Sequence, residues 1–266
     1  MYQTNESKLL ENDGVVLIED CFRTEEMQNL KLEYNQFNET LDSTEIPKNE
    51  PIVVFWTHKE GEQKRILPLN SFSSMKTLIE KSIVPTLREK LGEKAKRLQL
   101  LETIIFNKPS TKTNTLHWHQ DVAYFPLKPN NQLAVWFPLE IVTEERGAMG
   151  YALGSHKLGA RGSINLHTRQ VFDNEERPLI PDDPREEGLE TKIFEMSPRD
   201  MLVHDGYTWH YSGPNSVKNH NRKGVSVRFI TDEAVFDPRP GQGAAFTKQI
   251  EINKGDTLVS EAFPIL

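Results

Sequence analysis

The motif His119-Gln120-Asp121 places an imidazole and a carboxylate two residues apart in an apolar, aromatic stretch with the pattern of a β-strand. Side chains at positions i and i+2 of a strand leave the same face, so both groups can point at one spot. A histidine and an acid arranged in this way are two of the three ligands of the facial triad that binds non-heme Fe(II) and leaves coordination positions open. The motif therefore predicts a metal site, provided that a third ligand approaches it.

The third ligand must come from a histidine further along the chain. The candidates are His156, His167, His204, His210 and His220. His204 lies where a strand runs into a tight turn, and His220 lies in a polar loop. His210 belongs to the aromatic-rich segment 207–212, which returns from that turn and can pair as a strand beside the motif. Strand geometry therefore favours His210.

Two arginines follow, one on each side of a β-branched run. Arg222 and Arg228 flank the residues 225–227. A guanidinium group makes paired, charge-assisted hydrogen bonds to a carboxylate and stays protonated at working pH. Either arginine could hold the far carboxylate of a dicarboxylic co-substrate, and the residues alone leave both possibilities open.

The elements that position these residues are mainly strands. Short runs of β-forming residues between Gly, Pro and Asn turns predict strands at 15–18, 98–106, 115–124, 133–139, 147–153, 191–196, 201–204, 209–212 and 225–231. Such a pattern is typical of a β-sandwich or jelly-roll barrel with helices packed outside. Helices are expected at 5–12, at 24–37 and at 73–91, where Pro85 kinks or divides the last one.

The chain fits one domain, 1–266. It would have a β core at about 98–231, an N-terminal helical support at 1–97 and a C-terminal tail at 232–266 that packs on the domain or on a partner subunit. The segments 40–70, 157–190 and 233–250 are irregular and are expected to line a substrate pocket.

Composition limits the possible partners. The net charge is −7 without any dense basic stretch, which makes nucleic acid or an anionic membrane surface an unlikely partner. No apolar run is long enough to cross a bilayer, and the N-terminus does not resemble a signal peptide. Cys21 is the only cysteine, which fits a reducing compartment, so we expect a cytoplasmic protein. The loops or the C-terminal tail could form a homodimer.

The order of several motifs resembles the phytanoyl-CoA dioxygenase superfamily of Fe(II)- and 2-oxoglutarate-dependent oxygenases. The resemblance covers roughly residues 100–231. It is carried by Ile105-Phe106-Asn107-Lys108-Pro109, His119-Gln120-Asp121, Tyr124-Phe125-Pro126, Trp136, Gly154-Ser155-His156-Lys157, Arg199-Asp200, His210-x-Ser212-Gly213-x-Asn215 and Arg222. The family's fold, a double-stranded β-helix or cupin-like jelly roll, agrees with the strand pattern.

The resemblance also implies roles for individual residues. His119, Asp121 and His210 would bind iron, and Arg222 would hold the distal carboxylate of 2-oxoglutarate, with Arg228 as its rival. The co-substrate pocket would be completed by Ser212, Trp136 and Ile104. The implied cofactors are Fe(II), 2-oxoglutarate and O₂, with ascorbate as an activator in vitro.

The implied reaction is hydroxylation, or a related oxidation such as desaturation or ring formation, of an unactivated C–H bond. Related halogenases lack the carboxylate ligand, so the presence of Asp121 favours oxygenation over halogenation. Two alternatives stay open: a zinc hydrolase, since two histidines and a carboxylate also suit zinc, and a non-catalytic binding protein.

The substrate is expected to be a small molecule, with a specialised metabolite as one candidate. The aromatic residues Trp118, Tyr124, Tyr207 and Tyr211 would suit a ring-bearing substrate. An anionic substrate could meet Lys157, Arg161 and Arg169, although a solvated charged loop explains these residues as well.

Overall fold

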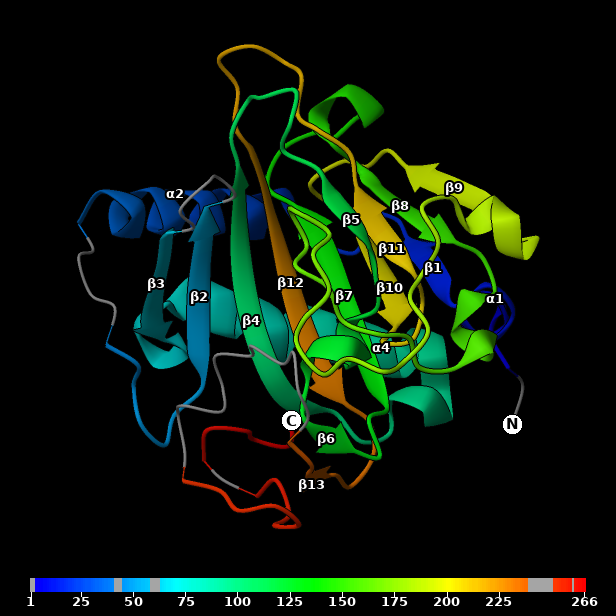
Figure 1. The fold of residues 1–266 in the computed structure, drawn as a ribbon. Coiled ribbons are helices and arrows are strands. Elements are labelled where there is room, and N and C mark those ends of the chain that lie inside the picture. The colour runs from blue at the N-terminus through cyan, green and yellow to red at the C-terminus, as the bar shows by residue number, and fades with distance from the viewer. Residues whose placement is uncertain (1–2, 41–44, 58–62, 239–250, 260) are drawn as a thin grey trace.

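The core of the fold is a pair of β-sheets (Figure 1), and the predicted site residues lie on their strands or directly after one of them. The computed structural model describes residues 3–40, 45–57, 63–238, 251–259 and 261–266. Its strands are β1 (Val15–Ile18), β2 (Ile52–Thr57), β3 (Gln63–Pro68), β4 (Gln99–Lys108), β5 (Leu116–His119), β6 (Leu127–Lys128), β7 (Gln132–Pro138), β8 (Met149–Ala152), β9 (Thr191–Phe194), β10 (Met201–Asp205), β11 (His210–Ser212), β12 (Arg222–Ile230) and β13 (Val235–Phe236).

Within the described residues, the larger sheet has seven strands in the order β1-β10-β7-β12-β4-β2-β3. The smaller sheet has four, in the order β5-β11-β8-β9, and β6 pairs with β13 in a separate ribbon. All pairings are antiparallel except the one between β2 and β4. The two sheets form the jelly-roll core that the strand pattern predicts.

The large sheet separates apolar and functional side chains by strict alternation. On β12, Val225, Val227 and Phe229 belong to the main hydrophobic core. The intervening residues Ser226 and Arg228 line a cavity between the sheets. Because alternate side chains leave opposite faces of a strand, one face of the sheet is anchored by packing while the other presents polar groups.

Helices cover the anchored face of the large sheet (Figure 1). They are α1 (Asn5–Asp13), α2 (Thr24–Thr40), α3 (Ser73–Leu78) and α4 (Val84–Leu91), close to the predicted positions. A π-helical turn, Ile79–Ile83, joins α3 to α4 without a break. Pro85 lies directly after this π-helical turn, as the second residue of α4, so the helix changes its hydrogen-bonding pattern next to the proline that was expected to kink or divide it.

Three expectations need correction. The predicted strand 115–124 ends at His119, because a 3₁₀ turn over Asp121–Tyr124 begins directly afterwards. The expected loop 40–70 contains the hairpin β2–β3, which extends the large sheet. Two prolines and a polar stretch before residue 52 concealed this hairpin. With β1, the segment 1–97 thus supplies three strands of the large sheet in addition to its helices.

The end of the chain packs on the domain itself, which is one of the two expected outcomes. Ala262 and Phe263 are buried against the end of the large sheet. The backbone N–H of Leu100 donates to the carbonyl of Pro264 at 2.9 Å, and the N–H of Leu266 donates to Leu98 at 2.9 Å. Of the expected loop 233–250, residues 239–250 lie outside the described part. A homodimer stays a prediction.

Candidate metal centre and its cavity

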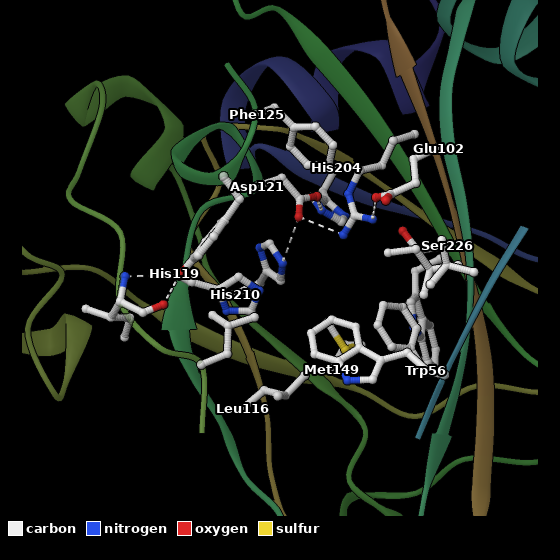
Figure 2. A pocket seen from close by; sticks show the side chains of 18 of the residues that line it. Trp56, Glu102, Leu116, His119, Asp121, Phe125, Met149, His204, His210 and Ser226 are labelled. Carbon is white, nitrogen blue, oxygen red and sulfur yellow. Dashed lines mark hydrogen bonds and ion pairs between the residues drawn. The ribbon is translucent and has the colours of Figure 1, made fainter. Parts of the chain in front are cut away.

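The three predicted ligands converge between the two sheets. His119, the last residue of β5, lies directly opposite His210, the first residue of β11. Asp121 opens the following 3₁₀ turn, and the extended backbone of Gln120 keeps it on the same side as His119. All three side chains are buried, and their ligand atoms lie within 4.8 Å of one another (Figure 2). The described residues contain no other group of this kind.

Both imidazoles are held in the tautomer that binds a metal. The Nδ1 atom of His119 is 2.7 Å from the His117 carbonyl, and that of His210 is 2.9 Å from the Thr208 carbonyl. A carbonyl can only accept, so Nδ1 carries the proton and Nε2 keeps its lone pair. Burial lowers the pKa of His119 to about 4 and also lowers the pKa of His210 well below its usual range. Both rings are therefore neutral at physiological pH.

Asp121 is held as a carboxylate by two neighbours. Arg228 Nη2 donates to Oδ1 at 2.8 Å, and His204 Nε2 lies 3.2 Å from Oδ2. Burial raises the pKa of Asp121, but the Arg228 guanidinium and the His204 hydrogen bond outweigh burial and hold this pKa well below its usual range. The set of two neutral imidazoles and one ionised carboxylate fits a divalent ion with open positions.

His204 is a site residue that the sequence argument passed over. His204 lies at the end of a strand, where strand geometry does not favour it as a ligand. It is nevertheless almost fully buried, and its Nδ1 lies 3.2 Å from the Tyr151 hydroxyl. The alternation of side chains along β10 could have identified His204 as a site residue. His204 shares a strand face with Leu202, and Leu202 packs in the same core cluster as Trp136, which lines the cavity. His204 orients the carboxylate ligand and does not join the ligand group.

The site has two centres: the three candidate ligands form the first, and Arg222 forms the second. Its Nη2 donates to Ser212 Oγ at 2.7 Å and to the Gly147 carbonyl at 3.0 Å, and its guanidinium lies 5.4 Å from the centre of the Trp136 ring. Its Nε is buried without a hydrogen-bond partner, and no carboxylate of the described residues pairs with it. Burial lowers the pKa of Arg222 to about 10. An anion at this position would be strongly stabilised.

A second buried base lies behind Ser212. The ammonium group of Lys108 donates to Ser212 Oγ at 2.7 Å and to the Ser212 carbonyl at 3.0 Å. Burial and the nearby Arg222 charge lower the pKa of Lys108 well below its usual range. Ser212 Oγ also donates to Gly147, so its hydrogen-bonding capacity is filled. Ser212 fixes the position of Arg222 and does not itself line the cavity.

A cavity of about 230 Å³ connects the two centres. Figure 2 shows its open middle, with His119 and His210 on one side and Glu102 and Ser226 on the other. The predicted residues Arg222, Trp136 and Ile104 line it, as do the three ligands. Further lining residues are Val54, Trp56, Glu102, Phe106, Leu116, Tyr124, Phe125, Met149, Ile164, Asn165, Leu166, Phe172, His204, Ser226 and Arg228.

Of the four aromatic residues proposed to face a substrate, only Tyr124 lines this cavity within the described part of the chain. Trp118 and Tyr211 pack against each other with ring centres 4.3 Å apart. Both lie on the strand face opposite to the ligands, since Trp118 precedes His119 and Tyr211 follows His210. The alternation that points the histidines inward therefore points these two rings outward.

Comparisons with known proteins agree with this site. A model of the phytanoyl-CoA dioxygenase (PhyH) family matches residues 10–224. A probable alpha-ketoglutarate-dependent hypophosphite dioxygenase of Stutzerimonas stutzeri is 28% identical over 210 residues, covering 76% of this chain and 70% of that protein. The peroxisomal phytanoyl-CoA dioxygenase of Homo sapiens is 20% identical over 243 residues, covering 86% of this chain and 68% of that protein.

Solved structures share the fold. The non-heme alpha ketoglutarate dependent carbocyclase SnoK from nogalamycin biosynthesis superposes with a TM-score of 0.72 at 19% identity, over 100% of this chain and 96% of that chain. The epimerase SnoN in complex with Fe³⁺, alpha ketoglutarate and nogalamycin RO gives a TM-score of 0.71 at 19% identity, over 98% of this chain and 96% of that chain.

The fold and the ligand set define a non-heme iron oxygenase. The chain belongs to the phytanoyl-CoA dioxygenase family and is a 2-oxoglutarate-dependent dioxygenase. The comparisons give no support to the zinc hydrolase or to the non-catalytic binding protein. None of the described helices is both long and apolar enough to cross a membrane.

Proposed function

We propose that this protein uses Fe(II), 2-oxoglutarate and O₂ to oxidise an unactivated C–H bond of a small molecule. His119, Asp121 and His210 would hold the iron, and the Arg222 guanidinium would bind the distal carboxylate of 2-oxoglutarate. Bound iron would activate O₂, which is the oxidant, and 2-oxoglutarate would supply two of the four electrons as it is oxidised to succinate and CO₂. The protein contributes positioning, charge and a cavity that excludes water.

One observation carries this proposal: an intact His₂-carboxylate group and a buried arginine without a carboxylate partner line the same cavity. A hydrolase has no use for the arginine, because its substrate need not be a dicarboxylate. An incoming carboxylate would give Arg222 the counter-charge that the described residues do not provide, and a desolvated pair of this kind binds strongly. Trp136 and Ile104 would wall the co-substrate on its apolar side.

The reaction class is open within C–H oxidation. The structural neighbours include an epimerase and a carbocyclase from nogalamycin biosynthesis, so one fold supports several reaction outcomes. We propose a specialised metabolite as the substrate and hydroxylation, desaturation or ring formation as the outcome. The cytoplasm is the proposed location, and ascorbate should sustain activity in vitro.

The test is succinate formation by purified protein supplied with Fe(II), ascorbate and 2-oxoglutarate under air, with and without fractions of cell extract. We expect slow decarboxylation that rises when a fraction contains the substrate. Wild-type protein with Zn(II) in place of Fe(II) is the matched control and should form no succinate. Zinc-dependent turnover, or no decarboxylation with any fraction, would contradict the proposal.

A further inference from the structure

The part of the cavity beyond the ligands and Arg222 is built mainly from apolar side chains, with Asn165, Ser226 and Tyr124 as neutral polar members. Val54 and Trp56 contribute from β2, and Ile164, Leu166 and Phe172 contribute from the loop that follows β8. Two hydrogen bonds hold this loop over the cavity. The Tyr124 hydroxyl donates to the Ile164 carbonyl at 2.8 Å, and the backbone N–H of His117 donates to the Leu166 carbonyl at 2.9 Å. A molecule that reaches the metal would therefore lie against an apolar wall.

The basic residues of this loop turn away from the cavity. Arg161 lies over the Trp209 ring at 4.9 Å and has Glu187 at 3.7 Å. Arg169 pairs with Asp182, and the ammonium group of Lys157 donates to the Asn12 carbonyl at 2.8 Å. None of the three lines the cavity. These contacts agree with the expectation that Lys157, Arg161 and Arg169 belong to a charged loop and do not bind the substrate.

The charges that do line the cavity cancel. Glu102 and Asp121 are the lining acids, and Arg222 and Arg228 are the lining arginines. Arg228 is held between both acids, at 3.4 Å from Glu102 and 2.8 Å from Asp121. The lining histidines are His119 and His210, which are candidate metal ligands, and His204, which lies 3.2 Å from the Asp121 carboxylate. Binding of Fe(II) and of the 2-oxoglutarate dianion would add two opposite double charges and leave the sum of the carboxylate and guanidinium charges at zero.

From these observations we infer that the substrate is an uncharged, mainly apolar molecule. The inference rests on the proposed function, because it assigns Arg222 to 2-oxoglutarate. A charged substrate would be buried without a counter-ion, which costs far more than burying a neutral group. Hypophosphite, as an anion, and a coenzyme A thioester, with its phosphates, would each need a cation that the described lining does not offer.

The test compares three probes with one skeleton: 3-phenylpropan-1-ol, 3-phenylpropanoate and 3-phenylpropylamine. Calorimetry under nitrogen first measures whether Fe(II)-loaded protein binds 2-oxoglutarate, and then titrates each probe into that complex. We expect the alcohol to bind at least about tenfold more tightly than either ion, which corresponds to about 1.4 kcal/mol.

The two steps separate the two proposals. If 2-oxoglutarate does not bind, the proposed function fails. If it binds, but an ion equals or exceeds the alcohol, only the present inference is overturned. The inference is also overturned if the alcohol shows no binding at about 10 mM, because an apolar neutral cavity must accept it at that concentration.

Charge variants provide a second measurement. Phe172→Lys adds a cation to the partly exposed loop wall, and Glu102→Gln removes one lining anion, so each should improve carboxylate binding relative to the alcohol by roughly tenfold. Glu187→Gln is the matched control, because Glu187 does not line the cavity, and it should leave the ratio unchanged. Phe172→Lys keeps the test decisive if Glu102→Gln fails to fold. An unchanged ratio in a folded Phe172→Lys protein would contradict the inference.

Discussion

Arg222 and Arg228 lie on one strand, β12, and both line the same cavity, yet their surroundings are opposite. Six residues apart, they leave the same strand face and are almost fully buried, at 3% and 8% exposure. Arg228 is bracketed by Asp121 and Glu102. Arg222 donates to a hydroxyl and a carbonyl and lies over the Trp136 ring, but it contacts no carboxylate. Among the described residues, one arginine has its counter-charges and the other does not.

The pKa values express this difference. Burial lowers the pKa of both groups, but at Arg228 the neighbouring Asp121 and Glu102 outweigh burial and raise the pKa above its usual value. At Arg222 nothing opposes burial, and its pKa falls to about 10. Arg228 is therefore a fixed structural charge that orients a candidate metal ligand, whereas Arg222 has no carboxylate partner among the described residues, as our proposal for 2-oxoglutarate binding requires. Two residues of one type on one strand face have different tasks because their neighbours differ.

The largest effect should follow from removing the carboxylate that distinguishes the two arginines. Asp121→Ala is expected to abolish metal binding and turnover, and also to destabilise the fold by about 3–5 kcal/mol, because Arg228 loses its closer counter-ion. Chemical denaturation and metal titration measure the two effects. His119→Ala is the matched variant: it should also abolish turnover but leave stability nearly intact. Equal stability of both variants would contradict the structural role of Arg228.

Arg222→Ala should weaken 2-oxoglutarate binding by about 30-fold to 1000-fold, since a buried charge pair loses one partner. It should not lower the stability of the protein without co-substrate, because the buried charge lacks a counter-ion in that state. Direct titration of 2-oxoglutarate with Fe(II) present gives the affinity. If Arg228→Ala weakens co-substrate binding more than Arg222→Ala does, the two arginines have been assigned the wrong way round.

Arg228→Ala should act mainly on stability. It leaves the buried carboxylates of Asp121 and Glu102 without their shared cation, and breaking such a group costs about 3–5 kcal/mol. The free energy of unfolding from urea titration tests this expectation. Arg228→Lys should recover part of the loss, because it restores charge without the two-pronged geometry. An unaltered free energy of unfolding in Arg228→Ala would show that the pairing contributes nothing.

The candidate ligand His119 should make the stability of the protein sensitive to mild acid. His119 has a folded pKa of about 4, below the value of an unfolded histidine. The unfolded chain therefore takes up a proton between about pH 6.5 and pH 4 while the folded chain does not, so stability falls as pH decreases through this window. Unfolding measured at several pH values should show this slope, and His119→Ala should reduce it. A slope that is unchanged in His119→Ala would refute the assignment.

The smallest effect should come from Ser212→Ala. The Ser212 hydroxyl joins Arg222, Lys108 and the Gly147 carbonyl, so its loss should loosen Arg222 without removing the charge. We expect 2-oxoglutarate affinity to fall by only about 3-fold to 10-fold, because the hydroxyl acts on the co-substrate only through the position of Arg222. Calorimetry under the conditions used for Arg222→Ala makes the two losses comparable. A loss as large as that of Arg222→Ala would mean that Ser212 contacts the co-substrate directly.

Several features could be predicted from the sequence because they depend on local pattern. The i, i+2 spacing of His119 and Asp121 survives although the strand ends between them, since the intervening residue is still extended. Alternation placed His210 correctly, and it also explains why Trp118 and Tyr211 face outward. The hairpin β2–β3 escaped prediction because its pairing with β4 joins segments far apart in sequence, and local composition carries no signal for such pairing.

By itself, the sequence determined the jelly-roll class, the three candidate ligands and two candidate arginines, because hydrophobic alternation and motif spacing are properties of neighbouring residues. Only the tertiary structure decided which arginine is already paired, that His204 supports Asp121, and that the basic residues of the loop 157–190 face away from the cavity. These outcomes depend on which side chains from distant segments share a desolvated space. In such a space the presence or absence of one carboxylate sets the charge, the pKa and the task of its neighbour.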